Sequence, residues 1–169
     1  MENTSRHTEP KQGWLRPDLV IAPMPAESAA EAIAQLGARL QAGGFVKPSW
    51  VQAAIEREKI FATGLPTAEV GVAIPHTDVE HVLQQAIAVG VLTEPILFGE
   101  MGNPENTVPV RLVCALAVAQ SQFLLKLLQQ LVQMFQTPGV LSQIVSAASP
   151  AQIARIFEDH LELTEDITT

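Results

Sequence analysis

Cysteine is almost absent from the chain, whose 169 residues include only Cys114. A single thiol excludes a disulfide framework within the chain, and it excludes a zinc site built on cysteine ligands. Cys114 lies inside the apolar run 112–119, and this position favours a small buried hydrophobic residue over a nucleophile.

Basic residues are also few, since 10 lysines and arginines stand against 18 acidic residues and the formal net charge is −8. This balance argues against a nucleic-acid binder and against electrostatic docking to an anionic membrane surface. It still permits a phosphate-handling site, because one well-placed arginine suffices to hold a phosphoryl group.

Long hydrophobic runs are missing as well. The longest run, residues 112–119, is too short to cross a bilayer, and residues 1–16 contain no hydrophobic segment of the kind found in secretory signals. We therefore expect a cytoplasmic protein with no direct membrane insertion.

The common nucleotide and hydrolase motifs are absent from the sequence. It contains no phosphate-binding loop of the form Gly-x-x-x-x-Gly-Lys-Ser/Thr, no Gly-x-Gly-x-x-Gly fingerprint and no Gly-x-Ser-x-Gly elbow. The sequence therefore offers no standard motif for binding a nucleotide.

Hydrophobic residues, counting the aromatic ones, make up 47% of the chain, and their pattern along the sequence predicts an α/β fold. Near-continuous apolar runs are typical of strands covered on both faces, and apolar residues recurring every three or four positions are typical of helices. Strands are expected at 19–22, 72–74, 86–92 and 108–119, and helices at 25–40, 47–59, 121–136, 140–147 and 149–161, with a turn-rich loop at 99–106. This alternation predicts a single layered domain, a central mixed and mostly parallel β-sheet with helices on both faces. The domain is expected to span residues 18–163, between a flexible lead-in (1–17) and an acidic tail (164–169).

One histidine follows directly on a predicted strand, in the stretch Gly71 to Asp78. Pro75 disfavours the helical conformation for Ile74, so the strand should end at Pro75 and His76 should lie in the first turn beyond it. A rigid strand followed by a loop often presents a reactive side chain in this way. Taken alone, these residues fit an ordinary surface histidine better.

His76 is nevertheless the nucleophile that remains once the other motifs are excluded, since a neutral imidazole can attack phosphorus. A phosphohistidine needs one exposed ring nitrogen, a hydrogen bond that holds the other, and donors around the phosphoryl oxygens. The candidate donors are the guanidinium of Arg57 and the hydroxyl groups of Thr63, Thr67 and Thr77. The charged segment 56–59 that contains Arg57 fits a solvated helix end about equally well.

A metal site is the alternative use of the same segment. His76, Asp78 and His81, with Glu80 between them, carry imidazole and carboxylate groups that can bind zinc. The segment begins as a turn, however, so no helix sets the geometry of these ligands. We expect no metal at this position.

The order of these motifs resembles a known family. A Trp-Val-x-Ala-x-x-x-Arg-Glu helix at 50–58 is followed by Thr-Gly-Leu at 63–65, Gly-Val-Ala-Ile-Pro-His at 71–76 and a Leu-rich helix after a central strand. Over residues 19–161 the sequence resembles the enzyme IIA domain of the bacterial phosphoenolpyruvate-dependent sugar phosphotransferase system, mannitol/fructose class (type 2). Within that class it is most similar to galactitol-specific components.

The resemblance implies a role for each partner. His76 would accept a phosphoryl group from the phosphocarrier protein HPr and pass it to a cysteine of a cognate enzyme IIB, and the sugar would be phosphorylated during uptake through an enzyme IIC permease. Arg57 falls on the family's arginine near the active histidine. The resemblance also implies that no metal or nucleotide takes part.

The sequence departs from the family pattern at two places. Many members carry glycine after Pro-His, where this chain has Thr77. Many also carry a second histidine in a His-Leu-x-Leu-Leu pattern, where this chain has Leu124. Galactitol-type members lack that histidine too, and Gln120, Ser121 or Gln122 could supply a neutral donor instead. Thr63, Thr77 and Gln122 are therefore the expected phosphate contacts.

Two further functions stay open at this point. The same domain could be regulatory, with the phosphorylation state of His76 controlling how it docks to a partner. A small metal-dependent hydrolase using His76, Asp78 and His81 is the alternative from a different class.

Overall fold

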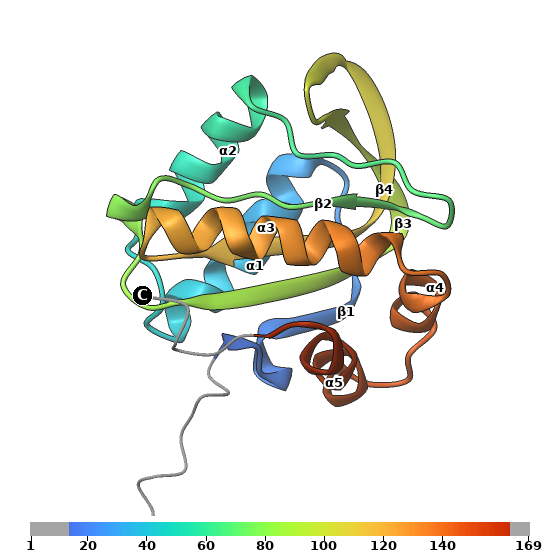
Figure 1. Cartoon of the computed structure of the whole chain (residues 1–169). Coiled ribbons are helices and arrows are strands. Elements are labelled where there is room, and N and C mark those ends of the chain that lie inside the picture. The colour runs from blue at the N-terminus through green and yellow to red at the C-terminus, as the bar shows by residue number, and fades with distance from the viewer. Residues whose placement is uncertain (1–13, 163–169) are drawn as a thin grey trace, which may run out of the picture.

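The computed structural model describes residues 14–162. The strands are β1 (Val20–Met24), β2 (Gly71–Ala73), β3 (Ala86–Glu100) and β4 (Asn103–Ala117). The α-helices are α1 (Ala29–Ala42), α2 (Trp50–Ile60), α3 (Ser121–Gln136), α4 (Val140–Val145) and α5 (Pro150–His160), with short 3-10 helices η3 (Pro17–Leu19) and η4 (Val79–His81). Figure 1 shows their arrangement around one sheet.

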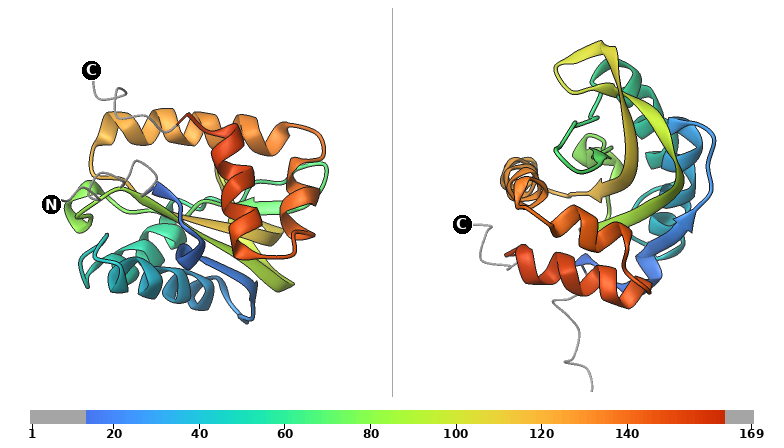
Figure 2. Two further views of the ribbon diagram at one scale, coloured as in Figure 1. Left: turned by 90° about the horizontal axis from the view of Figure 1, so that it is seen from below. Right: turned by 90° about the vertical axis from the view of Figure 1, so that its right-hand side faces the viewer.

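The four strands form a mixed sheet in the order β1-β3-β4-β2. β1 runs parallel to β3, and β2 runs parallel to β4, while β3 and β4 form the antiparallel pair at the centre. Helices α1 and α2 cover one face, and α3, α4 and α5 cover the other (Figure 2). The predicted α/β class, with a mixed sheet between two helical layers, is confirmed.

Each face of the sheet has its own hydrophobic core, because successive strand residues point to opposite faces. On β4, Leu112, Cys114 and Leu116 pack toward α3, α4 and α5, whereas Val113 and Ala115 pack toward α1 and α2. Burial on both faces explains why residues 86–92 of β3 and 112–117 of β4 carry no charged or strongly polar side chain.

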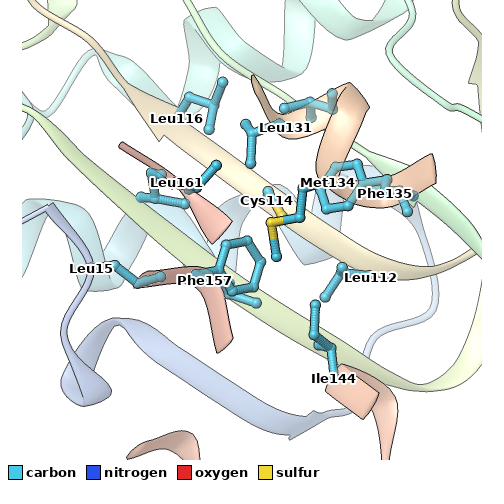
Figure 3. Packing of buried hydrophobic residues seen from close by; sticks show 14 of the residues in the cluster. Leu15, Leu112, Cys114, Leu116, Leu131, Met134, Phe135, Ile144, Phe157 and Leu161 are labelled. Atoms are coloured by element: carbon cyan, nitrogen blue, oxygen red, sulfur yellow. The ribbon is translucent and has the colours of Figure 1, made fainter. Parts of the chain in front are cut away.

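Cys114 lies in the middle of the first of these cores, among Leu131, Met134, Ile144 and Phe157 (Figure 3). The residue is fully buried, and this burial raises the pKa of its thiol far above the ordinary value. The prediction of a buried hydrophobic cysteine is therefore confirmed, and the thiol is not placed to act as a nucleophile.

The expectation of a loop at residues 99–106 is wrong, because most of these residues belong to strands. β3 and β4 continue through this region as one long hairpin, in which Glu100 pairs with Asn103 across the turn residues Met101 and Gly102. Gly102 takes a positive φ of 82°, which a tight hairpin turn requires and glycine adopts without strain. The turn-forming residues around it suggested a loop. The ladder is irregular there, since Gly99 pairs with Thr107 but Glu100 pairs with Asn103, which leaves residues 104–106 without a partner in the ladder.

Helix boundaries agree with the predicted segments to within a few residues. α1 begins later than expected because Ser28 caps it, accepting a hydrogen bond from the backbone N–H of Glu31. α5 begins as predicted, with Ser149 as the cap and Pro150 in the first turn.

The last residues of the predicted lead-in 1–17 dock on the domain, as the apolar side chains of Trp14 and Leu15 allow. Leu15 is buried in the core of the α3–α5 face, and the ring of Trp14 packs on Phe123 with 4.6 Å between centroids. Residues 1–13 and the predicted tail 164–169 lie outside the described residues. Across residues 14–162, none of the helices combines the length and the apolar character that a bilayer span requires.

Candidate functional site

His76 lies just beyond the end of β2, as the proline before it predicts. Pro75 leaves the β2 ladder, but its carbonyl oxygen still accepts a hydrogen bond of 2.9 Å from the backbone N–H of Leu116 on β4. The turn therefore stays close to the sheet, and His76 is only 8% exposed. The expectation that the loop would expose this side chain is therefore wrong for most of the imidazole ring.

The imidazole of His76 is held by one hydrogen bond to the main chain. Its Nδ1 lies 2.9 Å from the carbonyl oxygen of Ile74. A carbonyl oxygen can only accept, so Nδ1 carries the hydrogen and Nε2 keeps its lone pair in the neutral ring. One ring nitrogen is thus fixed and the other is left as a nucleophile.

The surroundings of His76 favour the neutral ring. Burial lowers the pKa of His76 below its usual value, the nearby charge of Arg57 lowers it further, and the Ile74 carbonyl and Asp78 oppose the change. Since only the neutral imidazole is nucleophilic, this environment favours attack near neutral pH.

Arg57 comes from the last turn of α2 and lies on the same side of the molecule as His76. Its Nη1 lies 3.3 Å from Oδ1 of Asp78, and its guanidinium stacks over the ring of Phe61 at 5.1 Å. Within residues 14–162, its Nε–H is among the few buried side-chain groups without a hydrogen-bond acceptor. The Arg57 side chain as a whole is 33% exposed and bonds Asp78 through Nη1, so the exposed end of the guanidinium can reach an anionic group.

The neighbouring residue, Glu58, contradicts the interpretation of segment 56–59 as a solvated helix end. Glu58 is only 9% exposed and points inward. Its carboxylate accepts hydrogen bonds from Thr63, at 2.7 Å from the backbone N–H and at 3.0 and 3.1 Å from Oγ1. The spacing of the sequence could have indicated the burial of Glu58, because it lies four and eight residues after Ala54 and Trp50 and so shares their helix face. All three side chains are buried in the structure.

The hydroxyl group of Thr63 both donates and accepts a hydrogen bond. It donates to Glu58 and accepts a hydrogen bond of 2.9 Å from the backbone N–H of Ile74. Thr63 is therefore close to the His76 segment, as expected, but its proton points to a carboxylate and is not free to bond a phosphoryl oxygen.

The other expected contacts lie in different settings. Thr77 is buried next to His76, and its hydroxyl donates to the carbonyl oxygen of Asp78 at 2.8 Å. Gln122 is exposed in the first turn of α3, and Leu124 packs against the core in a half-buried position. No hydrogen bond between Gln122 and His76 is found among the described residues. Thr67 bonds its own loop through the carbonyl of Val70.

The residues of the alternative metal site have separate partners. Asp78 pairs with Arg57, while Nδ1 of His81 lies 2.8 Å from Oγ of Ser49. In the part of the chain from 14 to 162, no three histidine, cysteine or acidic side chains are grouped as a metal ion would require.

Burial of Glu58 leads to a prediction about stability and pH. Burial raises the pKa of Glu58 from 4.5 to about 7, although the bonds from Thr63 and the charge of Arg57 oppose the rise. The folded protein therefore binds this proton more tightly than the unfolded chain, so stability should fall as pH rises from 4.5 to about 7. Relative to Glu58→Gln, the wild-type free energy of unfolding should drop by about 3 kcal/mol at most across this range. Denaturant titrations of both proteins at several pH values measure the difference, in which the contribution of His76 cancels. Parallel curves would contradict the prediction.

Comparison with known proteins identifies the family. The family model described as "Phosphoenolpyruvate-dependent sugar phosphotransferase system, EIIA 2" matches residues 14–160. The galactitol-specific EIIA component of Escherichia coli (strain K12) is 33% identical over 117 residues, which cover 69% of this chain and 77% of that protein.

Two solved structures from Escherichia coli share the fold. IIA mannitol superposes with a TM-score of 0.70 at 26% identity, over 84% of this chain and 97% of that one. Enzyme IIAMTL in its complex with phosphorylated enzyme IIBMTL superposes with a TM-score of 0.71 at 25% identity, over 86% and 97%. The predicted resemblance to a type 2 enzyme IIA is thereby confirmed. The chain belongs to the EIIA type 2 family of the phosphoenolpyruvate-dependent sugar phosphotransferase system.

Proposed function

We propose that this protein carries a phosphoryl group on Nε2 of His76, taking it from phospho-HPr and passing it to a cysteine of an enzyme IIB. The observation that carries the proposal is the hydrogen bond from Nδ1 of His76 to the carbonyl oxygen of Ile74. This bond leaves the lone pair on Nε2, beside a cationic arginine. The similarity to a galactitol-specific component supports galactitol or a related sugar alcohol as the final acceptor, through a IIC permease, with the carrier in the cytoplasm.

The transfer step is chemically simple at this site. A bond forms between Nε2 of His76 and phosphorus as the bond from phosphorus to the donor's ring nitrogen breaks. The donor histidine, protonated on its other nitrogen, leaves as a neutral imidazole. His76 becomes an imidazolium that keeps its hydrogen on Nδ1, so its bond to the Ile74 carbonyl becomes charge-assisted and stronger.

Arg57 is proposed to stabilise the phosphoryl oxygens. Phosphoryl transfer is accelerated chiefly by positioning and by electrostatic stabilisation of the three equatorial oxygens. The Nε–H of Arg57 is buried without an acceptor, and its ion pair with Asp78 is long, at 3.3 Å. The long ion pair and the 33% exposure of the Arg57 side chain leave the guanidinium able to bond an incoming phosphoryl group. Thr77 and Gln122 would serve as contacts only after their side chains turn toward His76.

The test is labelling of the purified protein with phosphoenolpyruvate, enzyme I and HPr, followed by intact-mass measurement. We expect one phosphoryl group per chain, labile to acid and stable to base as a phosphohistidine is. Adding a galactitol-type enzyme IIB should then remove the label from this protein and transfer it to the IIB cysteine. Absence of the label would refute the carrier function. A label that no IIB removes would instead indicate the regulatory role.

A further inference from the structure

A continuous set of hydrogen bonds connects the interior of α2 with the ring of His76. The Glu58 carboxylate accepts from the backbone N–H and the hydroxyl of Thr63, and the Thr63 hydroxyl accepts from the N–H of Ile74. The carbonyl of the same Ile74 accepts from Nδ1 of His76. We refer to Glu58, Thr63 and Ile74 with these bonds as the Glu58–Thr63–Ile74 network.

The network determines the direction of the Ile74 carbonyl. On one side, the N–H of Ile74 is held by Thr63, and on the other, the carbonyl oxygen of Pro75 is held by the N–H of Leu116. Between these two fixed points, Pro75 restricts Ile74 to extended backbone angles. The Ile74 carbonyl therefore has little freedom to turn away from the imidazole.

The residues of the network are buried, so a lost hydrogen-bond partner is not easily replaced. Ile74 is fully buried, Thr63 is 3% exposed and Glu58 is 9% exposed. Water therefore has little access to replace a lost partner, and a buried polar group without a partner is costly. The same α2 turn sends Arg57 toward Asp78 and Glu58 toward Thr63, so one helix end holds both the cation and the bonds that reach the histidine.

We infer that Glu58 and Thr63 are positioning residues for phosphoryl transfer, which hold the Ile74 carbonyl so that His76 keeps its hydrogen on Nδ1 and its lone pair on Nε2. The inference rests on the proposed function of His76. It assigns to Thr63 a role through Ile74, in place of a direct contact with the phosphoryl group. The competing explanation is a purely structural one, in which the network only closes the loop after α2.

The experiment compares Thr63→Val with Thr63→Ser. Valine keeps the volume of threonine but has no hydroxyl group, whereas serine keeps the hydroxyl and loses one methyl group. In Thr63→Val, kcat for phosphorylation by phospho-HPr should fall up to about 100-fold, while KM for phospho-HPr stays close to the wild-type value, because the docking surface is unchanged. Thr63→Ser should restore most of kcat. Glu58→Gln, which has one acceptor oxygen in place of two, should lower kcat in the same direction by less.

The second measurement is the tautomer of His76 in the unphosphorylated protein. Long-range proton–nitrogen NMR spectra of the ring, recorded where the imidazole is neutral, should show hydrogen on Nδ1 in the wild type and in Thr63→Ser. Thr63→Val should shift population to the form with hydrogen on Nε2. A hydroxyl that only contacted the phosphoryl group, or only closed the loop, would leave this tautomer unchanged.

The outcomes separate this inference from the proposed function. If the wild type accepts the label on His76, but folded Thr63→Val keeps both the wild-type kcat and the wild-type tautomer, the positioning role is wrong and the carrier function stands. If the wild type accepts no label, the carrier function itself fails. Thermal unfolding of each variant establishes that the folded protein is being compared.

Discussion

Replacing His76 with alanine is expected to abolish phosphorylation of the protein by phospho-HPr. The substitution removes Nε2, and no other side chain near Arg57 in the described structure offers a comparable nucleophile. Cys114 is fully buried in the core beneath α3, α4 and α5, and burial raises the pKa of its thiol. The loss should be complete, because a covalent carrier without its acceptor atom has no residual route. Intact-mass measurement after incubation with phosphoenolpyruvate, enzyme I and HPr gives the result directly.

The control for this prediction uses the other histidines of the described structure. His160 also places Nδ1 2.9 Å from a main-chain carbonyl oxygen, that of Ile156, but it is exposed at the end of α5. His81 bonds Ser49. Both His160→Ala and His81→Ala should accept the phosphoryl group as the wild type does. A label that persists in His76→Ala, or that disappears in His160→Ala, would move the acceptor away from His76.

Replacing Arg57 with alanine is expected to slow phosphoryl transfer by about 100- to 1,000-fold, the usual effect of removing one donor that stabilises charge in a transition state. The substitution removes the guanidinium of Arg57, and with it the N–H donors and the positive charge close to His76. Single-turnover labelling with phospho-HPr measures the rate. Arg57→Lys should recover only part of it, because a lysine ammonium cannot reproduce the planar donor pair of a guanidinium.

The fold should survive this substitution. The ion pair joins Arg57 to an Asp78 side chain that is 76% exposed, and such pairs contribute only about 0–1 kcal/mol to stability. Lys59→Ala is the matched control, since it removes a positive charge from the same helix end at an exposed position. If Arg57→Ala transfers at the wild-type rate, or if Lys59→Ala slows transfer equally, Arg57 has no specific part in the site.

Much of the architecture followed from local patterns. The first half of β3 and the second half of β4 could be recognised because both of their faces are covered, which leaves a nearly continuous apolar run. The start of α5 could be recognised because Ser149 and Pro150 are the residue types that a helix start prefers. The hairpin around Gly102 could not be recognised from the sequence, because strand pairing depends on residues that are distant along the chain and local composition does not identify them.

The candidate site divides in the same way. That a strand ends before Pro75 and is followed at once by His76 was determined by the sequence alone, because proline acts on the conformation of its own neighbour. That Arg57 lies close enough to His76 to lower its pKa, and that Glu58 is buried against Thr63, was decided only by the tertiary structure. Helical periodicity states which face of α2 is apolar, but it does not state which charged side chain at the helix end loses its water. Desolvation depends on what packs over a group from elsewhere in the chain. Here the carboxylate of Glu58 is bonded by Thr63, whose hydroxyl in turn bonds the segment that bears His76.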